Sequence, residues 1–269
     1  FIIQSTCPPV NDTLMEVLIF IDSLRRASAG EINVIIPYFG YARQDRKSKP
    51  REPISSKLVA DLLVTAGAHR VITFDLHAAQ IQGFFSCLED DISAIPLLGH
   101  TILKDKDIDK KNLVTVSPDH GGVNRARKIA EKLNTPIAII DKRRNSKYQP
   151  EVMNIIGDVV GKRCIMIDDM VDTGKSACIG AKALLDAGAT GVQLAAVHAV
   201  FSKPCYDLMK NGPFEEIIVT DSIPLTPEFR ELKLVKVVTL ANMLAECIDR
   251  IVNNAPLSAV YSAYGPARE

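Results

Sequence analysis

The sequence has no tryptophan, no net charge and no long hydrophobic run. Its 269 residues balance 32 Lys and Arg against 32 Asp and Glu, which excludes a global electrostatic attraction to nucleic acid or to a membrane surface. No apolar stretch approaches the roughly 18 residues of a membrane helix, and the start lacks the basic region of a signal peptide. We therefore expect neither a nucleic-acid nor a membrane partner, and any bound anion must be held locally.

Paired cysteines are lacking too. The six cysteines are scattered without a C-x-x-C pair, which is typical of reduced thiols in a cytoplasmic protein rather than of a disulfide frame or a zinc site. The chain is 47% hydrophobic and 24% charged, enough to bury one large core or two moderate ones. It opens on the apolar run Phe1-Ile-Ile without a methionine, and we expect its natural beginning to lie upstream.

Short apolar, β-branched runs alternate along the chain with longer helical patterns. Most of these runs are continuous, which predicts strands buried on both faces, and the alternation predicts a parallel α/β architecture in two units. We place the first domain at residues 1–98, joined by 249–269, and the second at 99–248. The expected strands are 32–39, 71–76, 113–117, 137–140, 164–167, 192–199 and 217–220, and the expected helices are 11–27, 55–66, 122–133, 175–187 and 240–253.

The stretch MIDDMVDTGKS places acids directly after an apolar run. The strand is expected to end at Ile167, the loop to cover 168–174, and a helix to begin at Lys175, where free N–H groups and the helix dipole favour an anion. The acids at the front of the loop would repel that anion, and they suit hydroxyl groups or a metal ion instead. A sugar phosphate has hydroxyl groups for the acids and a phosphate for the helix start, so it fits both parts of the stretch. A surface turn is the alternative, whereas a P-loop is excluded because Asp169 stands where its glycine is required.

Two further strand ends carry polar side chains. Asp75 and His77 are expected on one face of the strand at 71–76, by the two-residue period of a strand; a core or capping histidine is the alternative. Asp119 follows the strand at 113–117, ahead of two glycines that let a ligand approach the backbone. An ordinary turn with Asp119 as the helix cap is the alternative there.

A basic run, Asp141-Lys-Arg-Arg144, follows the strand at 137–140. By itself it is either a solvated surface run or a cationic site. The polar segment that follows, through Gln149, is a candidate mobile lid.

Aromatic residues crowd with Arg43 and Gln44 after the strand at 32–39. Aromatic and guanidinium faces can stack on a base, and an amide can hydrogen-bond to it; an ordered loop packed by its own aromatics is the alternative. All these stretches fall at the carboxyl ends of expected parallel strands, where open α/β sheets bind their ligands.

Five segments carry a family resemblance: PYFGYARQDRK, TFDLHAAQIQGFF, VSPDHGGVNRARK, IIDKRR and IDDMVDTGKS. In order and content they resemble the ribose-phosphate pyrophosphokinases, which make phosphoribosyl diphosphate (PRPP), and they span essentially the whole chain. The resemblance implies two α/β domains of phosphoribosyltransferase-like fold with mainly parallel sheets, assembled as dimers and usually hexamers. It also implies transfer of the β,γ-diphosphoryl group of Mg-ATP to the 1-hydroxyl of ribose 5-phosphate, with release of AMP.

The resemblance also implies roles for individual residues. Lys142 and Arg144 match the family's mobile catalytic cations. His77 and Asp119 match its magnesium ligands, a pair that suits an ion keeping most of its waters. The residues that match its ATP contacts are Arg43, Gln44 and Asp45. Those that match its ribose 5-phosphate contacts are Asp168 and Asp169, which face the ribose hydroxyls, and Asp172, Thr173, Gly174, Lys175 and Ser176, which form the 5-phosphate loop.

The sequence departs from the family pattern at three places. Lys175-Ser176 stands where many members have glycine or alanine and then threonine, which adds a charge beside the phosphate. Only Ser258 remains of two serines near the family's regulatory phosphate site, so the resemblance does not carry inhibition by ADP over to this chain. The family's N-terminal segment, with its acidic and aromatic ATP loop, has no counterpart here, and we expect ATP binding to be weaker for that reason.

Two alternatives come from other functional classes. A phosphoribosyltransferase that consumes PRPP would share the acidic stretch but would not need FGYARQDRK or DKRR. A catalytically silent regulatory homologue would be expected to lose His77, Lys142 or Arg144, and all three are present.

Overall fold

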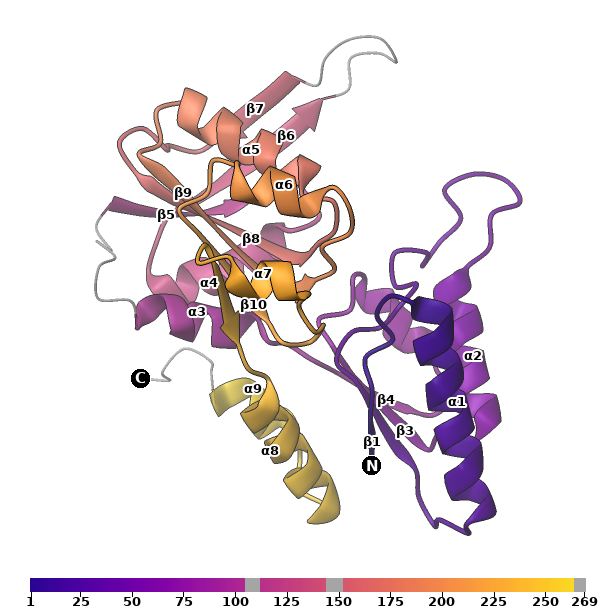
Figure 1. Cartoon of the computed structure of the whole chain (residues 1–269). Coiled ribbons are helices and arrows are strands. Elements are labelled where there is room, and N and C mark those ends of the chain that lie inside the picture. Colours follow the sequence, from indigo (N-terminus) through magenta and orange to yellow (C-terminus); the bar gives the residue numbers. More distant parts are fainter. Residues whose placement is uncertain (105–111, 144–151, 264–269) are drawn as a thin grey trace. The chain divides into compact units, whose positions relative to one another are not determined.

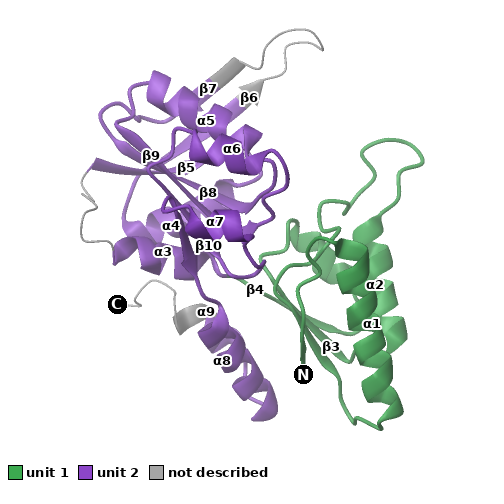
Figure 2. Ribbon diagram, in the orientation of Figure 1, with its two compact units in different colours: residues 1–93 green, residues 94–269 purple. Residues whose placement is uncertain are grey.

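A computed structural model describes residues 1–104, 112–143 and 152–263 of the chain. These residues form two compact units, Phe1–Ser93 and Ala94–Glu269 (Figure 2). Each unit has its own sheet and is described here by itself. The assignment of 249–269 to the first domain stays a prediction.

The first unit is built on a four-stranded parallel sheet in the order β1-β2-β3-β4 (Figure 1). Two helices, α1 (Val10–Arg26) and α2 (Ser55–Ala66), pack on one face, because each places apolar residues at helical spacing toward β2 and β3. The strands are β1 (Ile2–Ile3), β2 (Asn33–Ile36), β3 (Arg70–Phe74) and β4 (Leu88–Ile92), and a 3-10 helix, η1 (Ala79–Phe84), follows β3.

Strand β4 is a correction, because this acidic segment was not among the strands expected from the sequence. It pairs with β3 in parallel register, Glu89 opposite Val71 and Asp91 opposite Thr73. An edge strand tolerates such charges. The Thr73 hydroxyl lies 2.8 Å from Glu89 Oε1 and 3.1 Å from Asp91 Oδ1, while Glu89 Oε2 is buried and has no hydrogen-bond partner within the described part of the chain.

Glu89→Gln is expected to stabilise the protein at alkaline pH only. Burial, with help from Asp91 and Asp90, raises the pKa of Glu89 from 4.5 to about 7. A carboxyl group whose pKa is raised in the folded state makes its full contribution to the free energy of unfolding below pH 4.5. That contribution is lost as the pH rises through 7. Chemical denaturation should show the variant about 1 kcal/mol more stable than wild type at pH 8 and equal to it at pH 5. The exposed Glu31→Gln is the control, and a difference that does not change with pH would contradict this account.

The second unit holds a seven-stranded sheet in the order β11-β10-β9-β8-β5-β6-β7, parallel except for the β6–β7 pair. Helices α3 and α4 lie on one face, and α5, α6 and α7 lie on the other (Figure 1). The strands are β5 (Leu113–Ser117), β6 (Ile137–Arg143), β7 (Val152–Ile156), β8 (Arg163–Val171), β9 (Gly191–Ala199), β10 (Glu216–Thr220) and β11 (Val235–Val238). The helices are α3 (Ile95–Leu103), α4 (Val123–Leu133), α5 (Lys175–Asp186), α6 (Cys205–Lys210), α7 (Pro227–Glu231), α8 (Ala241–Val252) and α9 (Ser258–Ala263).

The predicted α/β class with mainly parallel sheets is confirmed. The parallel strands are continuous apolar runs because helices cover both faces of this sheet; β5 and β9, for example, are buried along their whole length. Within the described residues, no helix is both long and apolar enough to span a bilayer.

Candidate functional site

Asp168 and Asp169 lie within strand β8, not in a loop as the sequence predicted. The strand continues to Val171 because β9 offers it a long partner, with Asp168 opposite Ala196 and Met170 opposite His198. Strand β5 pairs with β8 only as far as Met166. The two acids therefore extend past the pairing with β5 at the carboxyl end of the sheet. Asp168 is half-buried there, and Asp169 is buried, with 3% of the residue exposed.

Arg125 joins the two acids and was not identified from the sequence. Its guanidinium nitrogens lie 3.3 Å from Asp169 Oδ1 and 3.8 Å from Asp168 Oδ1. The arginine comes from the first turn of α4, which follows the loop after β5. The sequence feature that could have pointed to Arg125 is the segment GGVNRARK. In it an arginine follows two glycines by three residues, at the start of a helix on the same edge of the sheet as the two acids.

Burial raises the pKa of Asp168 well above 3.8, and the hydrogen bond and charge of Asp169 raise it further; the Arg125 guanidinium opposes the shift. Asp168 Oδ1 also accepts a hydrogen bond of 2.9 Å from the Asp169 backbone N–H. The two carboxyl groups therefore lie close enough for the charge of Asp169 to act directly on Asp168. Such a pair offers acceptors for vicinal hydroxyl groups.

The loop after β8 leads directly into α5, as predicted. Gly174 has a φ of +76°, and Cys178 N–H donates to its carbonyl oxygen over 3.0 Å. The first N–H groups of a helix have no partner inside the helix and favour an anion. A Cβ on Gly174 would lie 2.5 Å from Met209 Cε and 3.2 Å from Cys205 Sγ, so α6 packs directly against the loop and a side chain there has no room.

The loop after β5 carries Asp119, which is exposed. Its Oδ1 accepts a hydrogen bond of 2.9 Å from the N–H of Gly122, the residue before α4. Because the N-cap of α4 is Gly122 and no side chain of the described residues caps the helix, Asp119 closes the turn before α4 and is not its cap. Next to it, His120 Nε2 lies 2.9 Å from Asp141 Oδ1 at the end of β6. One Asp119 oxygen is used in this turn, and the exposed carboxylate presents the other to a ligand.

Lys142 lies in β6, one residue after Asp141. The sequence predicted that this strand ends at Ile140, but it continues to Arg143 because β7 pairs with it in antiparallel register, Lys142 opposite Met153. Arg144 and the candidate lid through Gln149 lie outside the described residues.

Arg43, Gln44 and Asp45 lie in the loop after β2, with Arg43 and Gln44 exposed. The loop is held close to the preceding chain, since a Cβ on Gly40 would lie 2.5 Å from the Thr6 carbonyl oxygen. The Gln44 carbonyl accepts a bond of 2.9 Å from the Ser56 hydroxyl at the start of α2. These contacts fix the backbone of a loop whose two long side chains, Arg43 and Gln44, are exposed.

His77 follows β3 in the same unit and is exposed. The expectation that Asp75 and His77 share a strand face is wrong, because β3 ends at Phe74 and Asp75 adopts a φ of +42°. Asp75 instead accepts a 2.8 Å bond from the Ser93 hydroxyl. Asp45 accepts a hydrogen bond from Gln80 Nε2 in η1, which links the loop after β2 to the segment that follows His77.

No group of three His, Cys, Asp or Glu side chains within residues 1–104, 112–143 and 152–263 is arranged to hold a metal ion. Mg²⁺ commonly keeps several waters and is held by one or two carboxylates and by phosphate oxygens, so few protein ligands suffice for it.

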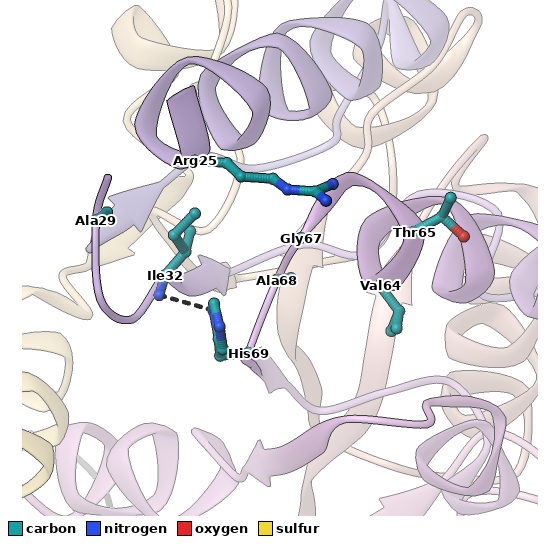
Figure 3. Close-up of a pocket in the computed structure, with 8 residues that line it drawn as sticks. All are labelled: Arg25, Ala29, Ile32, Val64, Thr65, Gly67, Ala68 and His69. Atoms are coloured by element: carbon teal, nitrogen blue, oxygen red, sulfur yellow. Dashed lines mark hydrogen bonds between the residues drawn. The ribbon is translucent and has the colours of Figure 1, made fainter. Parts of the chain in front are cut away.

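A cavity of about 470 Å³ in the first unit lies away from these residues (Figure 3). It lies at the amino ends of β2 and β3, where Ile32 N–H donates to His69 Nδ1 over 3.1 Å. Arg25 crosses it from the last turn of α1, where a cation complements the helix dipole. Arg43 and His77 follow the carboxyl ends of the same strands. The cavity is therefore separate from the candidate ATP and metal residues of this unit.

Two family profiles match the chain. One, described as the N-terminal domain of ribose phosphate pyrophosphokinase, matches residues 1–67. The other, described as a phosphoribosyl synthetase-associated domain, matches residues 142–262.

Similar proteins match almost the full chain. A ribose-phosphate pyrophosphokinase from Fusobacterium nucleatum is 53% identical over 262 residues, which is 97% of this chain and 82% of that protein. One from Caldanaerobacter subterraneus is 52% identical with the same coverage. The crystal structure of phosphoribosylpyrophosphate synthetase from Mycobacterium smegmatis aligns with a TM-score of 0.87 and 41% identity, covering 94% of this chain and 82% of that one. This likeness confirms the predicted fold class.

Proposed function

This chain belongs to the ribose-phosphate pyrophosphokinase family, and we propose from that premise how its residues divide the work of making PRPP. The activity is synthesis of PRPP from ATP and ribose 5-phosphate. The observation that carries the substrate assignment is the pairing of Asp168 and Asp169 at the end of β8, directly ahead of a glycine loop that opens a helix.

The second unit binds ribose 5-phosphate. The carboxyl groups of Asp168 and Asp169 accept hydrogen bonds from the ribose hydroxyls, and Arg125 keeps the pair in place. The loop 172–176 and the first turn of α5 bind the 5-phosphate through backbone N–H groups. Lys175 adds a positive charge at that helix start.

The first unit binds ATP. Arg43 and Gln44 are exposed at the carboxyl end of β2 and contact the nucleotide, while Asp45 positions the loop through Gln80. Stacking by a guanidinium and hydrogen bonding by an amide suit a base.

Mg²⁺ is the metal that the available ligands fit. His77 and Asp119 are each exposed at the end of a strand of their own unit, and each is proposed as one ligand. A hard cation that keeps several waters and binds phosphate oxygens needs few protein ligands. When bound, it neutralises charge on the ATP phosphates.

The chemistry is an in-line displacement at the β-phosphorus of ATP. The 1-hydroxyl oxygen of the sugar bonds to that phosphorus and loses its proton, the bond from the β-phosphorus to the α,β-bridging oxygen breaks, and AMP leaves. Lys142 and Arg144 stabilise the charge that develops on the oxygens of the transferring group. Positioning of the hydroxyl by Asp168 and Asp169 supplies the alignment.

A coupled assay for AMP tests the function directly. With ATP and ribose 5-phosphate the chain should release AMP, and with ribose or without an acceptor it should release almost none. AMP release that does not depend on ribose 5-phosphate would contradict the proposal. The two alternatives, a PRPP-consuming transferase and a silent homologue, gain no support from the relatives, which are named as pyrophosphokinases.

Self-association into a dimer and then a hexamer is part of the proposal. Helix α1 leaves Met15, Ile19 and Phe20 exposed by 56%, 63% and 51%, and α2 leaves Leu58 exposed by 59%. Apolar patches of this kind on a globular protein mark contact surfaces. The six cysteines all lie within the described residues and form no disulfide, which supports the proposed cytoplasmic location.

Ile19→Glu is expected to reduce the assembly state, because it places a charge beside the exposed apolar side chains Met15 and Phe20 of the same helix. Sedimentation velocity should show wild type as a dimer or larger and the variant as a smaller species. Val160→Glu, which changes an apolar residue exposed by 69% in the other unit, is the matched control and should sediment like wild type. A wild type that sediments as a monomer would contradict the proposal.

A further inference from the structure

The 5-phosphate loop contains an acid, Asp172, whose charge opposes that of its proposed ligand. A phosphate monoester is close to a dianion at pH 7, since its second pKa is about 6. A carboxylate within contact distance of it costs binding energy, because like charges repel. The loop must therefore hold this side chain away from the phosphate or lose affinity.

Ser202 supplies the restraint. Its hydroxyl donates a hydrogen bond to Asp172 Oδ1, and both side chains are half-buried. Ser202 lies in the turn between β9 (Gly191–Ala199) and α6 (Cys205–Lys210), whose residues Cys205 and Met209 pack against Gly174. The bond therefore turns the carboxylate toward β9 and α6.

Backbone contacts fix this turn on both sides of the serine. Phe201 N–H donates to the Val171 carbonyl oxygen over 3.0 Å, and Cys205 N–H donates to the Ser202 carbonyl oxygen over 2.9 Å. Phe201 itself has a φ of +45° and its ring stacks on Phe229, with centroids 4.2 Å apart. The hydroxyl of Ser202 is thus presented to Asp172 by a turn that is anchored independently of the phosphate loop.

We propose that Ser202 is a positioning residue for ribose 5-phosphate: its hydroxyl holds the Asp172 carboxylate away from the 5-phosphate and keeps the loop N–H groups available to it. The inference rests on the proposed function, because it requires the phosphate to bind at the loop 172–176. It adds a residue outside the family motif to the substrate site. The serine acts through Asp172 and does not touch the substrate.

Steady-state kinetics of a small set of variants on the full chain tests the proposal. Ser202→Ala should raise the KM for ribose 5-phosphate about tenfold, which is about 1.4 kcal/mol, with the KM for ATP and kcat changed less than about threefold. Ser202→Thr keeps the hydroxyl and should restore the wild-type KM. Adding Asp172→Asn to Ser202→Ala should recover most of the loss, because a neutral amide does not repel the dianion.

The pH dependence separates repulsion from a general loss of structure. In Ser202→Ala the KM for ribose 5-phosphate should rise relative to wild type between about pH 5.5 and 7.5, as the phosphate loses its second proton. A partly unfolded variant would lose kcat through its smaller active fraction and would keep its KM. Ser222→Ala removes a hydroxyl that is 2% exposed and bonded to the Val197 carbonyl, and should leave the KM unchanged.

An unchanged KM in Ser202→Ala, or no recovery when Asp172→Asn is added, would overturn the inference while wild type still makes PRPP. A wild type that releases no AMP with ribose 5-phosphate would instead overturn the proposed function. The two failures are therefore distinguishable in one experiment.

Discussion

Lys142→Ala is expected to lower kcat about a hundredfold or more, while the KM for either substrate changes little. The reason is that charge develops on the oxygens of the transferring diphosphoryl group in the transition state, and a cation placed for that charge binds the transition state more strongly than the ground state. Lys142 lies at the carboxyl-terminal part of β6, one residue beyond Asp141. Arg144→Ala should behave in the same way.

Lys182→Ala, which changes an exposed cation on α5, is the matched control for the loss of one positive charge. It should leave kcat within about twofold of wild type, because exposed charges far from the reacting atoms are screened. A loss confined to KM in Lys142→Ala would contradict the assignment of this lysine as catalytic.

Gly174→Val is expected to weaken ribose 5-phosphate binding about a hundredfold and to affect ATP far less. The valine must adopt a φ of +76°, and its Cβ would meet Met209 Cε at 2.5 Å and Cys205 Sγ at 3.2 Å. Met209 and Cys205 are fully buried, so their side chains have little room to give way. We expect the loop to shift away from α6 and to displace the N–H groups that bind the phosphate. Calorimetric titration of each ligand measures the two affinities separately.

Gly161→Val provides a matched control on the same unit. Gly161 has a φ of +70°, and a Cβ there meets nothing within 4 Å. Both variants therefore carry a similar backbone strain. Only Gly174→Val also crowds α6 and is expected to push the loop away from it. Equal losses of ribose 5-phosphate affinity in the two variants would show that strain, and not displacement of the loop, is the cause.

The apolar strands of the second unit could be predicted because burial on both faces leaves a continuous sequence pattern. Strand β5 has the predicted bounds, and β9 differs by one residue. Strand β8 runs four residues further than predicted, because pairing with β9 outweighs the acidic character of Asp168 and Asp169. No local pattern reports which neighbour a strand will have.

Strand β4 was missed for a related reason. Three of its five residues, in LEDDI, are acidic, a composition that opposes strand formation in isolation. Its pairing with β3 and the bond from Thr73 to Glu89 compensate for this. These partners lie sixteen or more positions away in the chain, so periodicity could not reveal them.

The glycine loop of the candidate site could be found from sequence, but the residues that hold it could not. Gly174 lies at the start of α5, as the glycine in MIDDMVDTGKS predicted. Arg125 and Ser202 come from α4 and from the turn after β9, and each acts through a contact with a distant acid. The spacing within one motif identifies the glycine loop. Arg125 and Ser202 are far from that motif in the sequence, and only folding of the sheet brings them to it.

The central claim is that the protein transfers an intact diphosphoryl group from ATP to ribose 5-phosphate. Phosphorus-31 NMR of a single reaction mixture tests it most directly, because it distinguishes the phosphorus atoms of donor and product. The account predicts one AMP for each new sugar product, and a product that carries a diphosphate on carbon 1 as well as its original 5-phosphate. Formation of ADP together with a singly phosphorylated carbon 1 would contradict it.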